Sequence, residues 1–212
     1  MTTIDIDTAR ALYEAGGGGH DFDHVLRVTA LAERIGQAEG ADMEVVRTAA
    51  LLHDVGENAD RERHHLLGAQ RARELLADHP AAFVDAVAHA IEAHRFRHDP
   101  QPLTIEAQVL SDADKLDAIG AIGIGRAFAY AGAAGTSLWR QPWPKIAGQG
   151  GDALRAPAEL GEGYTPVHEF VYKLDRIPER LFTATAKSIA HERRSFMRQF
   201  FDRLDREAMG EA

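Results

Sequence analysis

The sequence contains no cysteine, which excludes both disulfide bonds and thiolate metal sites. Any metal ion in the protein must therefore be held by nitrogen and oxygen atoms. No apolar run approaches the length of a membrane-spanning helix, and the first residues carry no signal-peptide pattern. We therefore expect a cytoplasmic protein that does not bind a membrane.

Basic residues are in the minority, with 24 Lys and Arg against 33 Asp and Glu and a net charge of -9. Binding of a nucleic-acid polymer depends on many basic contacts, so this charge argues against such a partner. A small phosphorylated ligand needs only a few local cations and stays compatible with the composition. Histidine, in contrast, is plentiful, with 11 residues.

Ala, Leu, Glu and Arg dominate the 212 residues, 45% of the chain is apolar, and no segment alternates as a strand does. The sequence therefore predicts an all-α protein, long enough for one domain with a substantial core. The expected helices span 7–15, 22–39, 43–55, 66–78 and 82–93, followed by a run from about 104 that keeps one apolar side through Ala118 and Ala121, and two helices after 165.

Two other segments are rich in residues that interrupt helices. The four glycines at 16–19 predict a turn, because a phosphate-binding loop would need a preceding strand and a following Gly-Lys-Ser/Thr. Residues 132–163 are rich in Gly, Pro, Trp and Gln and predict a lid-like loop.

In the last helix, the spacing predicts that the side facing the core carries Ile189, Phe196, Phe200 and Leu204.

Three helices each place a metal-type side chain on their apolar side. His24 shares that side of helix 22–39, His53 that of helix 43–55, and Asp114 that of the helix from about 104. Taken singly, an inward histidine is more often a satisfied core residue, and a buried aspartate can equally pair with an arginine.

With Asp54, which follows His53, these residues form a set of two imidazoles and two carboxylates. Burying such groups is costly unless something pairs with them, and a divalent metal ion is the obvious partner. The set suits Mn, Fe, Zn, Ni or Co, and its oxygen content favours the harder ions, with Mn first and Mg included. We expect one such ion.

The pattern extends beyond these four residues. Segments 20–28, 49–56, 111–126 and 168–174 resemble the HD-domain superfamily of metal-dependent phosphohydrolases, whose signature is a His, a His-Asp pair and a distant Asp, and within it the small bacterial YedJ/YpgQ-like branch. The resemblance covers most of about residues 20 to 207. It implies a single HD-type domain over 1–212, with a core at about 20–130, the lid-like loop at 132–163 and C-terminal helices at about 165–208 that complete the site.

The resemblance also implies a reaction. Such enzymes hydrolyse phosphoesters or phosphoanhydrides with a metal-activated water, and in this branch a nucleoside triphosphate would yield the monophosphate and pyrophosphate. A phosphomonoesterase or phosphodiesterase of the same fold is an alternative, as is a regulatory module that binds a nucleotide or metal without turnover. The sequence leaves open whether two chains form a homodimer.

Residues beyond the ligands acquire roles from the same resemblance. Glu57 matches a catalytic carboxylate of nucleotidase relatives and would act with Asp54, although an exposed loop carboxylate explains it equally well. Lys115 stands where deoxynucleotide-cleaving relatives contact phosphate, and Arg126, eleven residues on, would share its helix side in a cationic clamp unless both pair with surface acids. Asp117 would orient a water or a ribose hydroxyl, or pair with a nearby Lys or Arg.

The remaining candidates for substrate contact are His65, His94, His168 and Lys173. Histidines after the His-Asp pair can hold a second metal in HD relatives, but the paired-His pattern of the binuclear enzymes is not evident here. His64 or His65, together with His94, could therefore equally well form hydrogen bonds to the metal ligands or bind a phosphate group. His168 and Lys173 are candidates because they fall in the family-like C-terminal segment.

Overall fold

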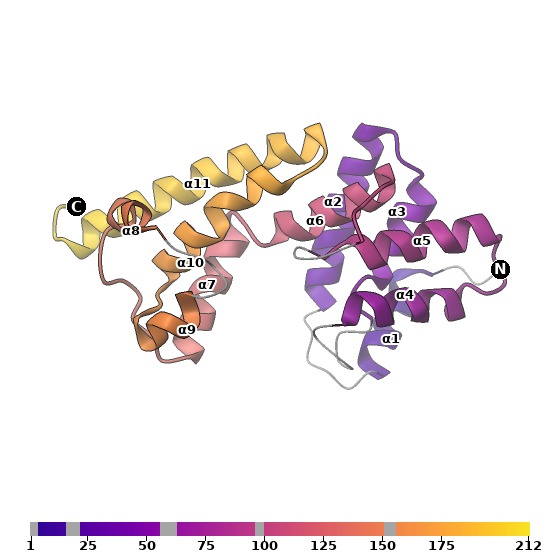
Figure 1. The fold of residues 1–212 in the computed structure, drawn as a ribbon, viewed down its shortest axis with the longest axis horizontal. Coiled ribbons are helices and arrows are strands. Elements are labelled where there is room, and N and C mark those ends of the chain that lie inside the picture. The colour runs from indigo at the N-terminus through magenta and orange to yellow at the C-terminus, as the bar shows by residue number, and fades with distance from the viewer. Residues whose placement is uncertain (1–3, 16–21, 56–62, 96–99, 151–155) are drawn as a thin grey trace. The chain divides into compact units, whose positions relative to one another are not determined.

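A computed structural model of the chain describes residues 4–15, 22–55, 63–95, 100–150 and 156–212. The regular elements in these ranges are helices, and no strand occurs among them, which confirms the all-α class (Figure 1). Within the same ranges, no helix combines the length and apolar character needed to cross a membrane. The predicted turn at 16–19 lies outside the described residues.

The chain divides into two compact units, which are described separately. Residues 1–115 and 181–186 make up the first unit, and residues 116–180 and 187–212 make up the second. The first unit contains α1 (Ile6–Ala15), α2 (Phe22–Glu39), α3 (Met43–Leu52), α4 (His64–Leu75), α5 (Ala81–Ala93) and most of α6 (Ile105–Asp117).

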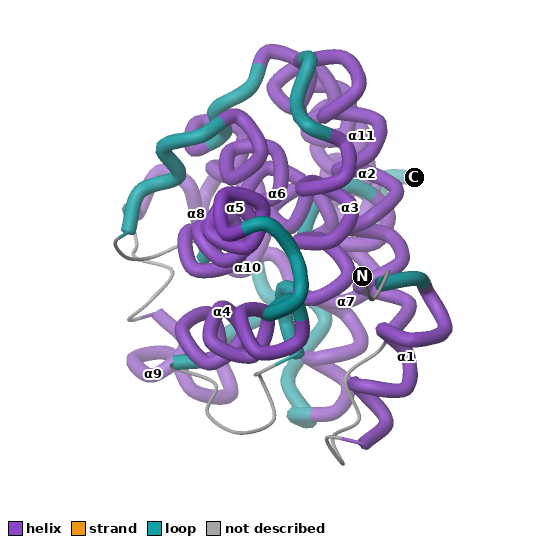
Figure 2. The backbone as a smooth tube through the Cα atoms, turned by 90° about the vertical axis from the view of Figure 1, so that its right-hand side faces the viewer, coloured by secondary structure: helices purple, strands orange, loops and turns teal. Residues whose placement is uncertain are grey.

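The first unit is built on three helix pairs. Helix α2 packs on α3, α3 packs on α5, and α4 and α5 lie side by side in both views (Figure 1; Figure 2). Their apolar sides meet in a core that excludes solvent from Val28, Ile35, Leu52, Ile91 and Leu110. The 22–39 helix has the predicted bounds, because its apolar spacing is regular and Gly40, with φ +72°, ends it.

Helix α3 begins where predicted but ends three residues early. Asp42 caps its start by accepting hydrogen bonds from the backbone N–H groups of Glu44 and Val45. The prediction of helix over 43–55 is wrong at its end, since α3 stops at Leu52 and residues 53–55 form a turn.

Helix α4 also departs from the prediction of 66–78, because it begins at His64 and ends at Leu75. His64 and His65 therefore lie on α4, ahead of the predicted start at residue 66. Helix α4 approaches the end of α3 closely at Gly68, where an added Cβ would lie 3.2 Å from the His53 carbonyl oxygen and 3.2 Å from Ile91 Cγ2. A glycine there lets α4 pack directly beside the His-Asp turn.

The second unit holds α7 (Ala121–Ala133), α8 (Trp143–Gln149), α9 (Ala156–Leu160), α10 (Pro166–Tyr172), most of α11 (Ala184–Ala208) and two 3₁₀ helices, η1 (Gly161–Gly163) and η2 (Leu174–Arg180). Segment 132–163 was predicted as a loop, but it carries α8, α9 and η1. Trp139 and Trp143 hold it to α11, because both indole N–H groups donate to aspartates of that helix, Asp205 and Asp202.

Two predicted apolar lines are wrong. The helix from about 104 does not continue through Ala118 and Ala121, because α6 ends at Asp117 and Gly120 adopts φ +81° before α7 starts. On α11, Ile189 is buried as predicted, but Phe196 is 48% exposed and the buried line runs through Met197 and Phe201. Stacking of Phe201 on Phe170, with ring centroids 4.2 Å apart, fixes that rotation of α11 within the second unit.

Candidate metal centre

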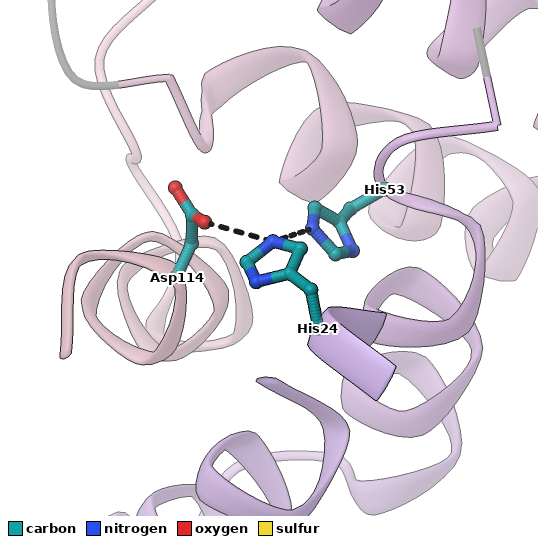
Figure 3. Close-up of side chains that lie close together, drawn as sticks. All are labelled: His24, His53 and Asp114. Atoms are coloured by element: carbon teal, nitrogen blue, oxygen red, sulfur yellow. Dashed lines mark hydrogen bonds and ion pairs between the residues drawn. The ribbon is translucent and has the colours of Figure 1, made fainter. Parts of the chain in front are cut away.

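Three elements of the first unit bring His24, His53 and Asp114 together (Figure 3). His24 lies in the first turn of α2, His53 directly after α3, and Asp114 near the end of α6. The His24 Nε2 atom is 3.4 Å from His53 Nε2 and 3.5 Å from Asp114 Oδ1. The predicted convergence of these side chains is therefore present.

Asp54 joins this trio to a second one. Its Oδ2 atom lies 3.3 Å from His53 Nε2 and 3.6 Å from His24 Nε2. Its Oδ1 atom lies 3.6 Å from His64 Nε2 and 3.7 Å from His94 Nε2. Asp54, His64 and His94 form a second group with the composition and spacing of a metal site. One carboxylate thus contacts four imidazoles.

The backbone fixes how two of the imidazoles present themselves. His53 Nδ1 donates to the Ala50 carbonyl at 2.8 Å, and His94 Nδ1 donates to the Ile91 carbonyl. A proton held on Nδ1 leaves the Nε2 lone pair free to bind a metal. Both histidines therefore aim a ligating nitrogen at Asp54.

The donor set fits a metal ion. Two ligand atoms that are each about 2.1 Å from one ion stand roughly 3.0–3.4 Å apart, depending on the coordination geometry. The contacts of 3.3–3.6 Å among His24, His53, Asp54 and Asp114 lie close to that range. Side-chain exposure rises from 0% at His53 to 28% at Asp114, so solvent reaches the group from the Asp114 side.

Electrostatics in the cluster favours charge separation. Burial opposes protonation of His53, but the neighbouring Asp54 carboxylate outweighs it and raises the His53 pKa. Burial likewise opposes ionisation of Asp54, but His53 and His94 hold the pKa of that carboxyl well below its usual range. The pKa of Asp114 is also lowered against burial, chiefly by the hydrogen bond from His24. A divalent cation would replace the protons on this set.

Lys115 lies in the first unit but is turned back along its own helix. Its ammonium donates to the carbonyl and the hydroxyl of Ser111 and lies 5.5 Å from the centre of the Phe182 ring. The Ser111 hydroxyl also donates to the His94 carbonyl at 3.1 Å. Lys115 is therefore connected through one serine to a histidine of the second trio.

The predicted sharing of one helix side by Lys115 and Arg126 is wrong, because Gly120 separates α6 from α7 and the two residues belong to different units. Arg126 instead pairs with Asp117 at 3.5 Å, which is one of the two alternatives left open for Asp117.

His168 and Lys173 also lie in the second unit and have local partners. The Thr165 backbone N–H donates to His168 Nδ1 in a capping box at the start of α10. Burial, with the nearby Arg140 charge, lowers the His168 pKa. Lys173 pairs with Glu169 at 2.7 Å.

Two other predicted residues lie nearer the cluster in sequence. His65 is buried on α4, with its ring 5.7 Å from that of His64. Glu57, the predicted catalytic carboxylate, lies outside the described residues.

Two residues at the cluster, Tyr13 and His64, had no predicted role of their own from the sequence. The Tyr13 hydroxyl, from α1, accepts the backbone N–H of Asp54 at 3.2 Å. A buried tyrosine on an amphipathic helix gives no sign of such a partner. The role of His64 follows from its place at the first residue of α4, two residues before the predicted start of that helix.

Comparison with known proteins identifies the family. Residues 21–119 match the HD domain. YpgQ of Bacillus subtilis is 36% identical over 209 residues, covering 91% of this chain and 86% of YpgQ. Ribonuclease Y of Chloroflexus aurantiacus is 36% identical over 110 residues, but the match spans 50% of this chain and only 20% of that protein.

Solved structures agree with the sequence matches. The crystal structure of B. subtilis YpgQ in complex with ADP has a TM-score of 0.70 at 33% identity, covering 95% of this chain and 94% of that one. A predicted HD superfamily hydrolase from an uncultured Thermotogales bacterium has a TM-score of 0.65 at 27% identity, covering 95% of this chain and 90% of that one. The chain therefore belongs to the HD superfamily of hydrolases, in the branch that contains YpgQ.

Proposed function

We propose that this protein is a divalent-metal-dependent phosphohydrolase that cleaves nucleoside triphosphates to the monophosphate and pyrophosphate. The observation that carries the proposal is the Asp54 carboxylate, which lies 3.3–3.7 Å from the Nε2 atoms of four histidines. Burying so many imidazole and carboxylate groups together costs free energy unless a cation pairs with them, so packing of the core alone does not explain the cluster. Membership of the HD superfamily supports hydrolysis as the reaction.

His24, His53, Asp54 and Asp114 would hold the ion, and Mn²⁺ is our first choice among Mn, Fe, Co, Ni, Zn and Mg. When bound, a divalent ion supplies an activated water and polarises a phosphoryl oxygen. Asp54, His64 and His94 would hold a second ion. Alternatively, N–H groups of His64 and His94 would donate hydrogen bonds to a phosphate oxygen. Glu57, three residues after Asp54, would accept a proton from the attacking water or donate one to the leaving oxygen.

A nucleotide is the proposed substrate because YpgQ, which matches this chain over nearly its whole length, has been crystallised with ADP. Lys115 and His65 of the first unit stay our candidates for phosphate contact. A role of Asp117, Arg126, His168 and Lys173 in substrate contact stays a prediction from the family resemblance. We place the protein in the cytoplasm, as a monomer or homodimer.

Phosphodiester hydrolysis is the second candidate, favoured by the match of about half the chain to Ribonuclease Y. The net charge of -9 weighs against a polymeric substrate, whose binding rests on basic contacts. A regulatory module that binds without turnover is the third candidate, but it would be free to lose ligands, and the described set is intact.

One screen separates these candidates. Purified protein is incubated with nucleoside mono-, di- and triphosphates and with an RNA oligonucleotide, each with Mn²⁺, Co²⁺, Ni²⁺ or Mg²⁺, and pyrophosphate is assayed separately from orthophosphate. We expect pyrophosphate from triphosphates alone. Release of orthophosphate alone would refute the proposed bond cleavage, RNA cleavage would favour the second candidate, and absence of turnover with bound metal would favour the third.

A further inference from the structure

The end of α3 is held by a residue from outside the HD match. Tyr13 lies on α1, ahead of matched residues 21–119, and is 5% exposed. Its hydroxyl accepts a hydrogen bond from the backbone N–H of Asp54 at 3.2 Å. Asp54 belongs to the second trio and also contacts His53 and His24 of the first, so this bond reaches the middle of the cluster.

The bond takes part in an exchange of partners at the helix end. In a continued α-helix, the Asp54 N–H would donate to the carbonyl of Ala50, four residues back. In this structure the Ala50 carbonyl accepts from His53 Nδ1 at 2.8 Å, and the Asp54 N–H donates to Tyr13. The Tyr13 hydroxyl thus accepts from the Asp54 N–H group, which has no helical partner, and the Ala50 carbonyl is left to accept from His53 Nδ1.

Tyr13 is itself held against the segment that carries another ligand. Its ring meets the ring of Phe22 edge to face, with centroids 5.4 Å apart, and the Arg10 guanidinium lies 4.4 Å from the centre of the Phe22 ring. Phe22 is the first residue of α2, two residues before His24. Tyr13 therefore contacts the chain segments of His24 and Asp54 at once.

We propose that Tyr13 is a positioning residue of the metal centre. It ends α3 at Leu52, so that His53 and Asp54 stand on a turn with their ligating atoms facing His24, and it lets the Ala50 carbonyl fix the ring of His53. The proposal rests on the metal centre of the proposed function, and it makes α1 a working part of a site otherwise built from the HD match.

The test is Tyr13→Phe, which keeps the ring and its packing on Phe22 but removes the acceptor. Metal-stripped wild type and variant are titrated with Mn²⁺ by calorimetry, after circular dichroism has shown equal helix content. We expect Mn²⁺ affinity to fall about threefold to tenfold, which corresponds to the loss of one neutral hydrogen bond. Tyr164→Phe is the matched control, because it deletes a tyrosine hydroxyl bound to Glu169 in the second unit and leaves Mn²⁺ affinity unchanged.

The outcomes separate the two claims. Wild type that binds none of Mn²⁺, Fe²⁺, Co²⁺, Ni²⁺, Zn²⁺ and Mg²⁺ would overturn the metal centre and the proposed function with it. Wild type that binds Mn²⁺ beside a Tyr13→Phe variant of equal affinity would overturn only the role of Tyr13. If Tyr13→Phe does not fold, hydrogen exchange of the Asp54 amide in the wild type decides: slow exchange supports the bond to Tyr13, and exchange as fast as in an unfolded chain refutes its role.

Discussion

Replacing Asp54 by Asn should separate metal binding from folding. The substitution keeps the shape of the side chain but removes the negative charge that four imidazoles approach. Asp54 belongs to one trio and lies within 3.3–3.6 Å of two members of the other, so both candidate ion sites lose their shared carboxylate. We expect Mn²⁺ affinity to fall by more than about 100-fold, beyond the loss typical of a residue that only supports a ligand.

The size of the effect on stability follows from linkage. At a metal concentration about 100 times the Kd, binding to the folded state alone stabilises it by about 2.7 kcal/mol. For a chain of this length, each kcal/mol raises Tm by about 2–4 °C, so Mn²⁺ should raise the wild-type Tm by roughly 5–10 °C. The Asp54→Asn variant should show no such rise at the same metal concentration.

Thermal unfolding with and without Mn²⁺ measures this difference, and Asp112→Asn is the control. Asp112 is a fully buried carboxylate of α6 that accepts from the backbone N–H groups of Phe182 and Thr183 and from the Thr183 hydroxyl. The control should lose stability yet keep the Mn²⁺-induced rise. An equal rise in Asp54→Asn and wild type would refute Asp54 as the shared ligand.

Three further predictions concern parts of the chain away from Asp54. Asp175 accepts hydrogen bonds from the guanidinium groups of Arg194 and Arg198, which lower its pKa against the opposing effect of burial. Asp175→Asn should therefore cost roughly 1–3 kcal/mol of folding free energy at pH 7. Because a carboxyl with a lowered pKa contributes this stability only while it is ionised, the difference from wild type in urea unfolding should be constant at neutral pH and shrink as the pH falls below the ordinary pKa of 3.8. A difference that grows on acidification would contradict this assignment. Gly120→Ala should destabilise the folded protein by about 1–3 kcal/mol, because Gly120 has φ +81°. Gly125→Ala on α7 is the control: an added Cβ meets nothing within 4 Å there, so this variant should be neutral or more stable by up to about 1 kcal/mol. Equal effects of the two substitutions in urea unfolding would show that the backbone conformation at Gly120 is unimportant. Trp143→Phe removes the indole N–H that donates to Asp202 and should lower the stability to thermal unfolding by about 1 kcal/mol. The Mn²⁺-induced rise in Tm should not change, and a loss of that rise would count against a metal site confined to the first unit.

Local spacing explains what the sequence predicted well. The inward position of His24 was predicted correctly because the regular apolar positions of α2 determine which side of that helix faces the core. Asp114 also lies in the predicted cluster, although α6 is buried on several sides from Val109 to Asp117. His53 followed from the same periodicity even though α3 ends one residue before it. The family resemblance then joined these residues to Asp54, and the described geometry brings all four together.

Long-range contacts explain what the sequence could not predict. The end of α3 depends on Tyr13, 41 residues away from Asp54, and no local pattern encodes that pairing. The joining of His64 and His94 to Asp54 depends on the packing of α4 against α5, which Gly68 allows. On α11, the phenylalanine at 196 fits a helical apolar line as well as Met197 does, and the rotation is selected by tertiary contacts such as the stacks of Phe201 on Phe170 and on Phe128.

The most direct test of the metal-dependent hydrolase is the paired substitution His53→Ala and Asp54→Ala in the full chain, assayed for bound metal and for nucleoside triphosphate turnover with added Mn²⁺. These two residues supply a nitrogen and a carboxylate that lie 3.3 Å apart at the middle of the cluster. We predict that the folded double variant neither retains metal nor releases pyrophosphate, while wild type does both. Turnover that is still stimulated by Mn²⁺ in the double variant would contradict the assignment.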